Sequence, residues 1–522
     1  MKDKLNFIQR GFIKTMGIDK YVADYEANRA LSYLKGNADS PVNYKEEEFR
    51  TWYYGTPFSL EYFYKKYFNH EQFHDHNFWR SVNTDMVRVH SPFAATISNT
   101  FGALLFYEKP NIRIDANKVS LTKDYQKRLN KIMDVNDFLS LLQEGAQLQS
   151  YSGSVGLKLN VDRGISDTPL ITLYPKERMN VERKFGQIIY IDFYDYYENG
   201  KYILVSRYGR GYINYRLYKG KDEVSLSVLP ETADLKDTAF YSDSKMLPII
   251  FAEAIQNKSG ERSDYDGLIP LFQALDETYS SMMNYIRKTK PNTKITEDLL
   301  EVNPNTDKPL PRSDFDDNII ILDAANDPEG KTSFIERDIT DIDVSGFENT
   351  IQQIKEEILM KVSLSPGTLG LQTGGAKESS EALEIRERAS VRIRQEKLSI
   401  WKEKLATFLS AAILLDTIIP NLVDNIDIYD IEELPDFEII VDFSEYKTVT
   451  FENKQKIFME QYEKGLIPLA FALISIYGDK YSKEQILELI IATKNEKGLT
   501  LTSKEEEYFN KNQDKMTLVD LI

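Results

Sequence analysis

The stretch from Ala376 to Ile419 contains neither glycine nor proline, and this limits the possible folds more than any other feature of the sequence. Ahead of it, residues 365–375 hold four glycines, one proline and no charged residue. An unbroken helix from Ser379 to Asp416 would be roughly 57 Å long at about 1.5 Å per residue. Since such a helix needs neighbours that bury its apolar positions, the pattern favours an assembly component over a pocket enzyme.

Composition excludes several classes of protein. At 522 residues, with 42% hydrophobic and 12% aromatic residues, the chain is long and apolar enough for several folded domains. It has no cysteine, which rules out disulfides, thiolate metal sites and cysteine nucleophiles. The charged start, Met1–Lys4, indicates no export signal. The longest apolar patches, 411–415 and 467–476, are too short for a membrane span, so we expect a soluble protein without membrane contact.

The net charge of −17 is unevenly distributed. Residues 417–522 contain 21 acidic and 11 basic side chains, a balance of −10. This argues against a protein that grips DNA by neutralising phosphates, although it is compatible with one that lets DNA pass. Solubility alone also explains such a charge.

The first half of the chain changes its hydrophobic period near Gly153. Residues 1–142 read as mainly helical, and Pro92 opens a helix whose apolar positions are Ile97, Phe101, Leu104 and Leu105. From about 153 to 230, alternating runs separated by Gly or Asn turns predict a tyrosine-rich antiparallel β-meander. We expect these tyrosines to pack on the faces of the sheet.

Two helices and a small insertion follow. The first helix starts near Pro270, and its apolar stripe comprises Leu271, Leu275, Tyr279, Met282, Met283 and Ile286. About fifty residues with a short strand, Ile319–Leu322, separate it from the second helix, which Ser345 and Glu348 open as a capping box. After Pro420 we expect strand pieces and short amphipathic helices. The predicted fold class is α+β, predominantly helical.

Three motifs could suggest chemistry, and each has a simpler explanation. Gly370 and Gly375 have the spacing of a phosphate-binding loop, but Ala376 stands where lysine is needed and a helix precedes the loop. His70, His74 and His76 form a cluster in which His70 and His74 would share one helix face, without the spacing of a zinc-protease motif. Acidic residues between 424 and 433 alternate with apolar ones, as on an exposed strand. We therefore expect no metal, no cofactor and no catalytic site.

Several segments together resemble the portal proteins of tailed bacteriophages, of the type found in long-tailed phages of Gram-positive hosts. These segments are 88–110 (RVHSPF…LLFYEKP), 153–159 (GSVGLKL), 173–178 (LYPKER), 363–382 (SLSPG…TGGAKESSEA) and 462–486 (YEKGLIP…SKEQI). Their order and spacing, rather than any single motif, carry the resemblance.

The resemblance implies a ring of about a dozen subunits around a channel, with the chain divided into wing, stem, clip and crown. The implied parts are a wing at 1–262, a stem helix at 263–290, a clip at 291–340, a second stem helix at 341–362, a tunnel loop at 363–380, a long wing helix at 381–416 and an acidic crown at 417–522.

It also implies partners and candidate contacts. The partners would be double-stranded genomic DNA without sequence preference, the large terminase subunit, major capsid and scaffolding proteins, and head-completion or adaptor proteins. The location would be the virion's portal vertex, after assembly in the host cytoplasm. The tunnel loop would place Ser365, Thr368, Gln372, Thr373, Gly374, Gly375 and Lys377 in the channel. Stem contacts to DNA could come from Arg287, Lys288, Lys290 and Lys294, although these cations also suit a helix C-terminus.

The alternative from a different class is a non-conducting scaffold or adaptor of a large assembly. Such a protein would use the same long helix and mixed charges to hold neighbouring copies, but it would enclose no channel.

Overall fold

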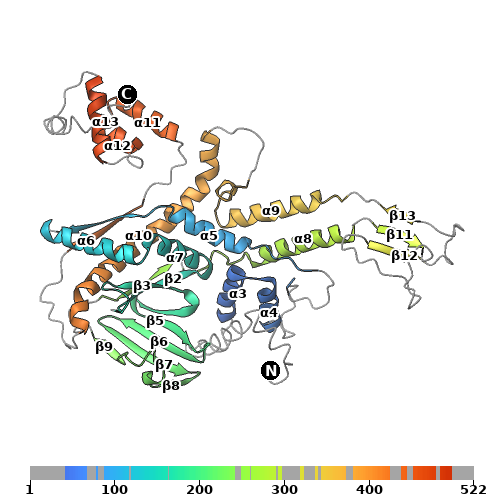
Figure 1. Cartoon of the computed structure of the whole chain (residues 1–522), viewed down its shortest axis with the longest axis horizontal. Coiled ribbons are helices and arrows are strands. Elements are labelled where there is room, and N and C mark those ends of the chain that lie inside the picture. Colours follow the sequence, from blue (N-terminus) through green and yellow to red (C-terminus); the bar gives the residue numbers. More distant parts are fainter. Residues whose placement is uncertain are drawn as a thin grey trace, which may run out of the picture. The chain divides into compact units, whose positions relative to one another are not determined.

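The computed structural model contains two compact units (Figure 1). Unit 1 is Met1–Thr373 with Arg388–Ser444, and unit 2 is Gly374–Glu387 with Glu445–Ile522. The structure describes residues 42–67, 78–79, 87–116, 119–162, 164–240, 249–258, 260–289, 292–296, 318–322, 335–338, 342–371, 380–423, 437–443, 451–477 and 483–496. Helices and strands are mixed, as the α+β prediction requires.

The described part of the first half contains helices where the sequence predicted a mainly helical region. They are α3 (Val42–Tyr54), α4 (Pro57–Tyr67), α5 (Phe93–Leu105), α6 (Val119–Val135) and α7 (Phe138–Ser152). As predicted, Pro92 precedes α5, and Ile97, Phe101, Leu104 and Leu105 are buried. Short 3₁₀ turns follow at η2 (Lys176–Arg178) and η3 (Leu226–Val228).

The predicted single meander is two sheets. Strand β2 (Ser154–Asn160) pairs with β3 (Leu170–Pro175) and with β10 (Ala252–Gln256), which is distant in sequence. The second sheet has the order β4-β5-β6-β7-β8, with β9 on β7. Its strands are β4 (Met179–Lys184), β5 (Gln187–Tyr197), β6 (Tyr202–Gly209), β7 (Tyr212–Lys219), β8 (Asp222–Val224) and β9 (Thr238–Phe240). Alternation predicted the strands, but it carries no information about which sheet each joins.

Tyrosines and phenylalanines pack the face of the larger sheet. Tyr194, Tyr202 and Tyr208 are buried, and the Tyr208 hydroxyl donates to the carbonyl of Leu159 at 3.0 Å. Phe193 packs edge-on against Tyr208, with 5.6 Å between ring centroids. The predicted packing role of these residues is confirmed, since rings of this size stabilise a sheet by covering its apolar face.

The long helix α10 (Ser380–Val423) starts where predicted and continues past Pro420. We expected its neighbours to be other copies of the chain, and for much of its length this is wrong. In the unit 1 part, Trp401, Leu405 and Phe408 are almost completely buried, as are Ala411–Leu415. Trp401 Nε1 donates to Gln149 Oε1 of α7 at 2.9 Å. Helices and sheets of the same chain therefore bury this half of α10.

A strand late in the chain belongs to unit 1. β14 (Phe437–Asp442) pairs antiparallel with β1 (Asn111–Ala116), and Ile112 lies opposite Val441. The predicted crown began at residue 417, so its first part belongs to the body of unit 1. The acidic segment 424–433 and the histidines His70, His74 and His76 lie outside the described residues.

Unit 2 contains α11 (Phe451–Glu463), α12 (Leu469–Tyr477) and α13 (Lys483–Glu496). Leu469, Leu473, Ile486 and Ile490 form its apolar core. Gly465 has φ 71°, and the N–H of Leu466 donates to the carbonyl of Gln461 at 2.9 Å, which ends α11. The amphipathic helices predicted for this region are confirmed.

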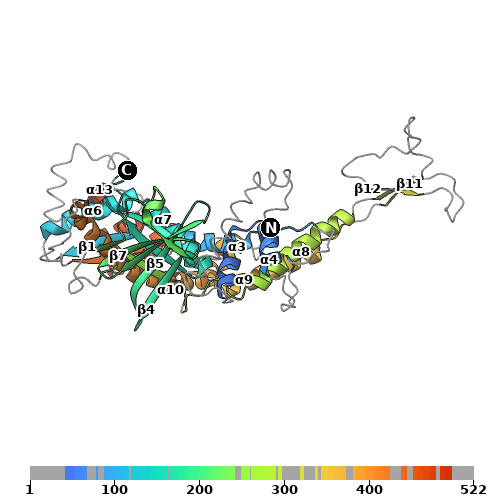
Figure 2. The ribbon, with the colours of Figure 1, turned by 90° about the horizontal axis from the view of Figure 1, so that it is seen from below.

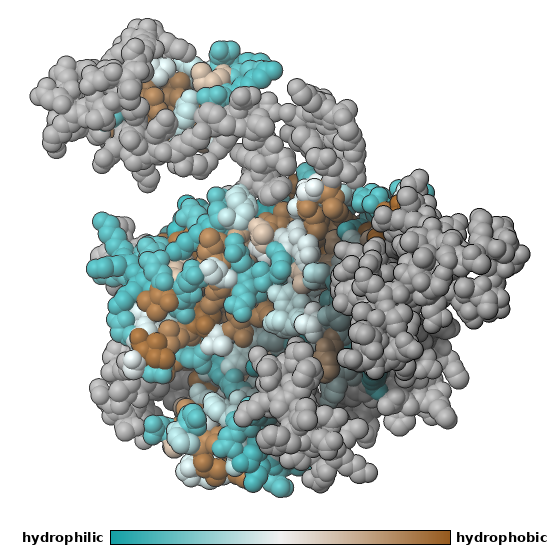
Figure 3. Space-filling view, turned by 45° about the vertical axis from the view of Figure 1, so that its right-hand side comes forward, coloured by the Kyte–Doolittle hydropathy of each residue, from teal (hydrophilic) through white to brown (hydrophobic). Residues whose placement is uncertain are grey.

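Among the described helices, none combines the length and the apolar character that a membrane crossing needs. On the face displayed in Figure 3, apolar patches alternate with polar ones instead of forming one continuous surface.

Candidate functional site

Helices α8 (Ile269–Lys288) and α9 (Ser345–Lys361) form an antiparallel pair (Figures 1 and 2). Lys355 Nζ of α9 donates to the Tyr279 hydroxyl of α8 at 2.9 Å. Nearer the other end, the rings of Tyr285 and Phe347 lie 5.8 Å apart. The two chain segments run in opposite directions side by side, which gives the long, narrow pair seen in both views.

A small sheet occupies the chain between the two helices. It has the order β12-β11-β13, with β11 (Asn292–Thr296) parallel to β12 (Asn318–Leu322) and antiparallel to β13 (Ile335–Asp338). The strand predicted at Ile319–Leu322 is confirmed as β12. The pair therefore has two different ends, one carrying this sheet and one joined to the rest of unit 1.

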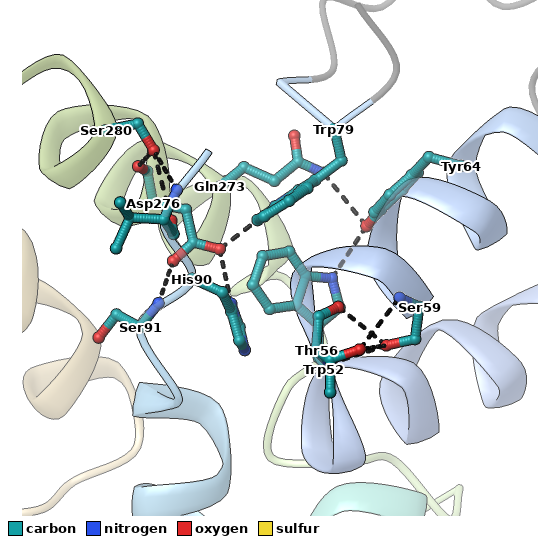
Figure 4. Close-up of polar contacts among 11 residues, drawn as sticks. Trp52, Thr56, Ser59, Tyr64, Trp79, His90, Ser91, Gln273, Asp276 and Ser280 are labelled. Atoms are coloured by element: carbon teal, nitrogen blue, oxygen red, sulfur yellow. Dashed lines mark hydrogen bonds and ion pairs between the residues drawn. The ribbon is translucent and has the colours of Figure 1, made fainter. Parts of the chain in front are cut away.

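A buried carboxylate fixes the base of α8 (Figure 4). Asp276, which has no solvent exposure, accepts from the backbone N–H of Ser91 at 2.7 Å and from Trp79 Nε1 at 3.2 Å. His90 Nδ1 lies 2.8 Å from Asp276 Oδ2, the same oxygen that accepts from Trp79, whereas the Ser91 N–H bonds Oδ1. Burial raises the pKa of Asp276, while the hydrogen bonds from His90, Ser91 and Trp79 lower it. These three donors offset part of the cost of burying the Asp276 carboxylate.

One turn further along α8, Ser280 continues the same connection. Its hydroxyl accepts from the backbone N–H of Val89 at 2.8 Å and donates to the carbonyl of Asp276 at 2.7 Å. The segment 89–91 is thus hydrogen-bonded to α8 at two successive turns, which prevents the helix from sliding along it.

A second group of polar contacts joins α8 to α3 and α4 (Figure 4). The Tyr64 hydroxyl accepts from Trp52 Nε1 at 2.9 Å and from Gln273 Nε2 at 3.2 Å, and it donates to Glu48 Oε1 at 2.6 Å. Burial raises the pKa of Tyr64, and the neighbouring Glu48 adds to this effect, so the phenol stays protonated and keeps donating. The base of the pair is a buried polar network in which His90 Nε2 alone, of the side-chain atoms in these two groups, lacks a hydrogen-bond partner among the described residues.

The buried face of α8 differs from the predicted stripe. Near the base the buried residues are Phe272, Leu275, Asp276 and Ser280, with Leu271 only half-buried. The predicted position Tyr279 faces α9 instead, through its contact with Lys355. A single stripe was the wrong expectation because α8 has two neighbours, the segment 89–91 with α3 and α4 on one side and α9 on the other.

The distal half of the pair is poorly covered by its own chain. Met282, Met283 and Ile286 are half-buried and Tyr285 is 37% exposed. Ile342, just before the distal start of α9, is 41% exposed. Met360 is 73% exposed but lies at the other end of α9, towards the base. Apolar residues on a two-helix projection need further helices to cover them, because a pair can bury only one face of each helix.

The start of α9 corrects a second expectation. We predicted a capping box in which Ser345 caps the helix, but Ser345 is its first helical residue. Asp343 Oδ1 accepts from the backbone N–H of Ser345 at 2.9 Å and from its hydroxyl at 2.6 Å. An aspartate two residues upstream fulfils the same need for an acceptor at a helix N-terminus.

After α9 the chain turns sharply and attaches to α10. Ser363 has φ 58°, and η6 (Pro366–Leu369) follows. The backbone N–H of Ser365 donates to Ser390 Oγ at 2.8 Å, and the hydroxyls of Thr368 and Ser390 lie 2.7 Å apart. The first part of the predicted tunnel loop is therefore fixed to the long helix.

A buried ion pair ties α10 to the segment that leads into α8. Lys397 Nζ lies 2.9 Å from Asp264 Oδ2 and also donates to Asn257 Oδ1. Lys258 Nζ lies 2.8 Å from Asp264 Oδ1. Burial by itself would raise the pKa of Asp264, but Lys397 and Lys258 outweigh it and hold this pKa at about 2. The carboxylate is thus ionised at neutral pH and fixes the two elements together.

The predicted site residues fall into three groups. Arg287 and Lys288 are exposed in the last turn of α8, where cations suit the helix C-terminus. Ser365 is buried and Thr368 half-buried, at the anchor on Ser390. Lys294 lies in β11. The remaining predicted positions lie outside the described residues: Lys290, Gln372, Thr373, Gly374, Gly375 and Lys377.

Sequence reasoning missed the residues that hold this region together. His90, Asp276, Asp264 and Lys397 are far apart in sequence, and only the fold brings them into contact. Lone polar residues within apolar helical patterns, such as Asp276 between Leu275 and Tyr279, were the one available signal.

Known proteins offer weak structural similarity to this chain and no sequence match. No family model and no curated protein matches the chain. A similar solved structure is described as "Neck of empty GTA particle computed with C6 symmetry", with 10% identity, a TM-score of 0.37 and coverage of 74% of this chain and 90% of that one. A TM-score this low does not establish a common fold, so the similarity assigns no function.

Proposed function

We propose that this chain is the subunit of a portal-type ring that forms a channel for double-stranded DNA. The observation that carries the proposal is the helix pair α8–α9, fixed by a buried network at its base and left half-covered distally. Tyr285 and Ile342 are exposed there, and other copies of the pair would bury them. A repeated heterologous contact of this kind closes into a ring.

The junction at the end of α9 suits the proposed role. Its loop starts from a fixed anchor, Ser365 and Thr368 on Ser390, and residues 366–376 carry no charge. A wall that meets a moving polyanion should avoid strong phosphate contacts, because each neutralised phosphate adds affinity and slows sliding. In this proposal the ring conducts DNA, a separate terminase supplies the energy, and the chain hydrolyses no nucleotide.

The oligomeric state of the purified chain tests the proposal. We expect native mass spectrometry to give a ring of twelve or thirteen subunits, negative-stain images to show an open central hole, and nucleotide hydrolysis to be undetectable. A monodisperse monomer would contradict the proposal. A ring with a closed centre would favour the non-conducting scaffold instead.

A loop deletion tests the channel itself. Removing residues 372–375 keeps the Thr368–Ser390 anchor, so the ring should form normally while heads carrying it fail to package or retain DNA. Replacing the same four residues by Gly-Ser-Gly-Ser is the matched control, and it should preserve packaging. Full heads from the deletion variant would argue against a role for this loop in the channel.

A further inference from the structure

The turn between β4 and β5 exposes an aromatic ring at its tip. Phe185 and Gly186 have φ values of 53° and 79°, which is the backbone of a two-residue type I′ turn. This turn favours Asn-Gly, since a bulky residue rarely adopts a positive φ. Phe185 is nevertheless there and is 94% exposed, the highest value among the described large apolar side chains. A strained position that presents an exposed ring points to a contact outside the chain.

The tip touches little of its own chain. A β-carbon added at Gly186 would meet nothing within 4 Å, so the space around the turn is open. Lys184 Nζ lies 5.7 Å from the centre of the Phe185 ring. The tip thus presents an aromatic ring with a cation beside it, a combination that fits a pocket with aromatic walls and acidic groups.

Unit 1 contains a pocket of that kind. An open cavity of about 710 Å³ lies between α3, α4, α7 and β3. Tyr54, Tyr62 and Phe63 form aromatic walls, and Tyr54 is 60% exposed. Four acidic residues and two arginines line it, a formal acidic balance in which Asp195 is also paired with Lys158 at 3.2 Å and burial raises the pKa of Glu177. The volume lies within the roughly 300–1,000 Å³ typical of ligand sites, enough for a phenyl ring and a lysine side chain.

The tip of one chain cannot fill its own pocket. Arg178 lines the pocket, and β4 starts at the next residue, Met179, and runs to Lys184. The six residues of β4 therefore hold the Phe185 tip roughly 20 Å from Arg178, at about 3.3 Å per residue. A second copy can supply the tip, and a contact between two different surfaces of identical chains propagates in one direction.

We infer that the β4–β5 turn of each subunit inserts Phe185 and Lys184 into the Tyr54–Tyr62–Phe63 pocket of the next subunit. The contact would be the wing-to-wing part of the proposed ring and in that sense rests on the proposed function. The charges are complementary, because Lys184 would enter a pocket with an acidic balance. The ring of Phe185 would stack on tyrosines, which are common anchors at interfaces.

Phe185→Asn separates assembly from folding. Asparagine suits the type I′ turn better than phenylalanine, so the isolated subunit should melt at a higher temperature than wild type, while ring yield falls at least tenfold. Phe185→Tyr, which keeps the ring, should assemble normally. If Phe185→Asn assembles as well as wild type, the inferred contact is wrong, although the proposed ring of subunits is not affected.

Cross-linking locates the contact, and because the chain has no native cysteine, only the introduced cysteines can react. In the double variant Gln187→Cys, Thr172→Cys, which keeps Phe185 and Tyr54, one cysteine lies beside the tip and the other lines the pocket, so a short bis-maleimide should join subunits into ladders on a denaturing gel. The control Gln187→Cys, Val228→Cys places the second cysteine at a residue that is 48% exposed and does not line the pocket, and it should give monomers. Rings without ladders overturn this inference alone. Ladders from chains that form open-ended oligomers support it while overturning the proposed ring.

Discussion

The two ends of the α8–α9 pair are stabilised in different ways. At the base, Asp276 has no solvent exposure and three donors reach its carboxylate. Towards the distal end, Tyr285 is 37% exposed and its ring packs on Phe347. The base is buried and hydrogen-bonded within one chain, whereas the distal half leaves apolar side chains partly exposed. This difference separates residues that fold the subunit from residues that assemble it.

Removing the buried carboxylate should have the largest effect. Asp276→Ala leaves Trp79 Nε1, the Ser91 N–H and His90 without their acceptor in a buried site. We expect the free energy of unfolding to fall by about 3–5 kcal/mol, measured by urea denaturation of the monomer.

Glu277→Ala is the matched control, since its side chain is exposed on the next residue of the same helix. It should change stability by no more than about 0.5 kcal/mol. An equal loss from both variants would mean that helix propensity, rather than the buried network, explains the result.

The Asp264–Lys397 pair makes a medium-sized and pH-dependent contribution. The pKa of Asp264, about 2, lies below the ordinary value of 3.8, so its ionised carboxylate stabilises the fold by at most about 2 kcal/mol at neutral pH. Burial lowers the pKa of Lys397, and this cost offsets part of that contribution. A depressed carboxylate pKa means that this contribution is complete above about pH 4 and is lost as the pH falls towards 2. Asp264→Asn should therefore flatten the dependence of stability on pH in that window.

Asp266→Asn provides the comparison for the acid titration. Asp266 is exposed two residues away, and its carboxylate lies 3.9 Å from Lys45 at the surface. The slope of stability against pH should stay as in wild type for this variant. If the slope of stability against pH for Asp264→Asn also equals that of wild type, other groups cause the acid sensitivity of the subunit.

Local patterns predicted the elements of the fold better than their partners. Pro92 and Pro270 marked real helix starts, and the absence of helix breakers placed the beginning of α10 within one residue of the predicted Glu381. These signals lie within a few neighbouring residues. The pairing of β1 with β14 and the contact of Asp276 with His90 join distant parts of the chain, which periodicity cannot encode.

The candidate site shows the same limit. The uncharged loop was visible in the sequence, but its anchor on Ser390 was not, because a serine on a charged helix looks like any exposed residue. The pocket beside Tyr54 was equally hidden, since α3, α7 and β3 contribute to it from separate parts of the chain.

The distal half of the pair should show the smallest effect on the subunit. Tyr285→Ser removes one ring from the contact with Phe347, so the monomer should lose about 1 kcal/mol, well below the loss for Asp276→Ala. Ring yield should nevertheless drop sharply, because the same ring would pack against the neighbouring copy. Sedimentation measures the fraction of assembled rings, and thermal melting measures the stability of the monomer, so the two effects can be separated. Lys288→Ser, at an exposed position, is the control. If Tyr285→Ser costs the monomer as much as Asp276→Ala, the chain itself supports the distal half and the contrast between the two ends fails.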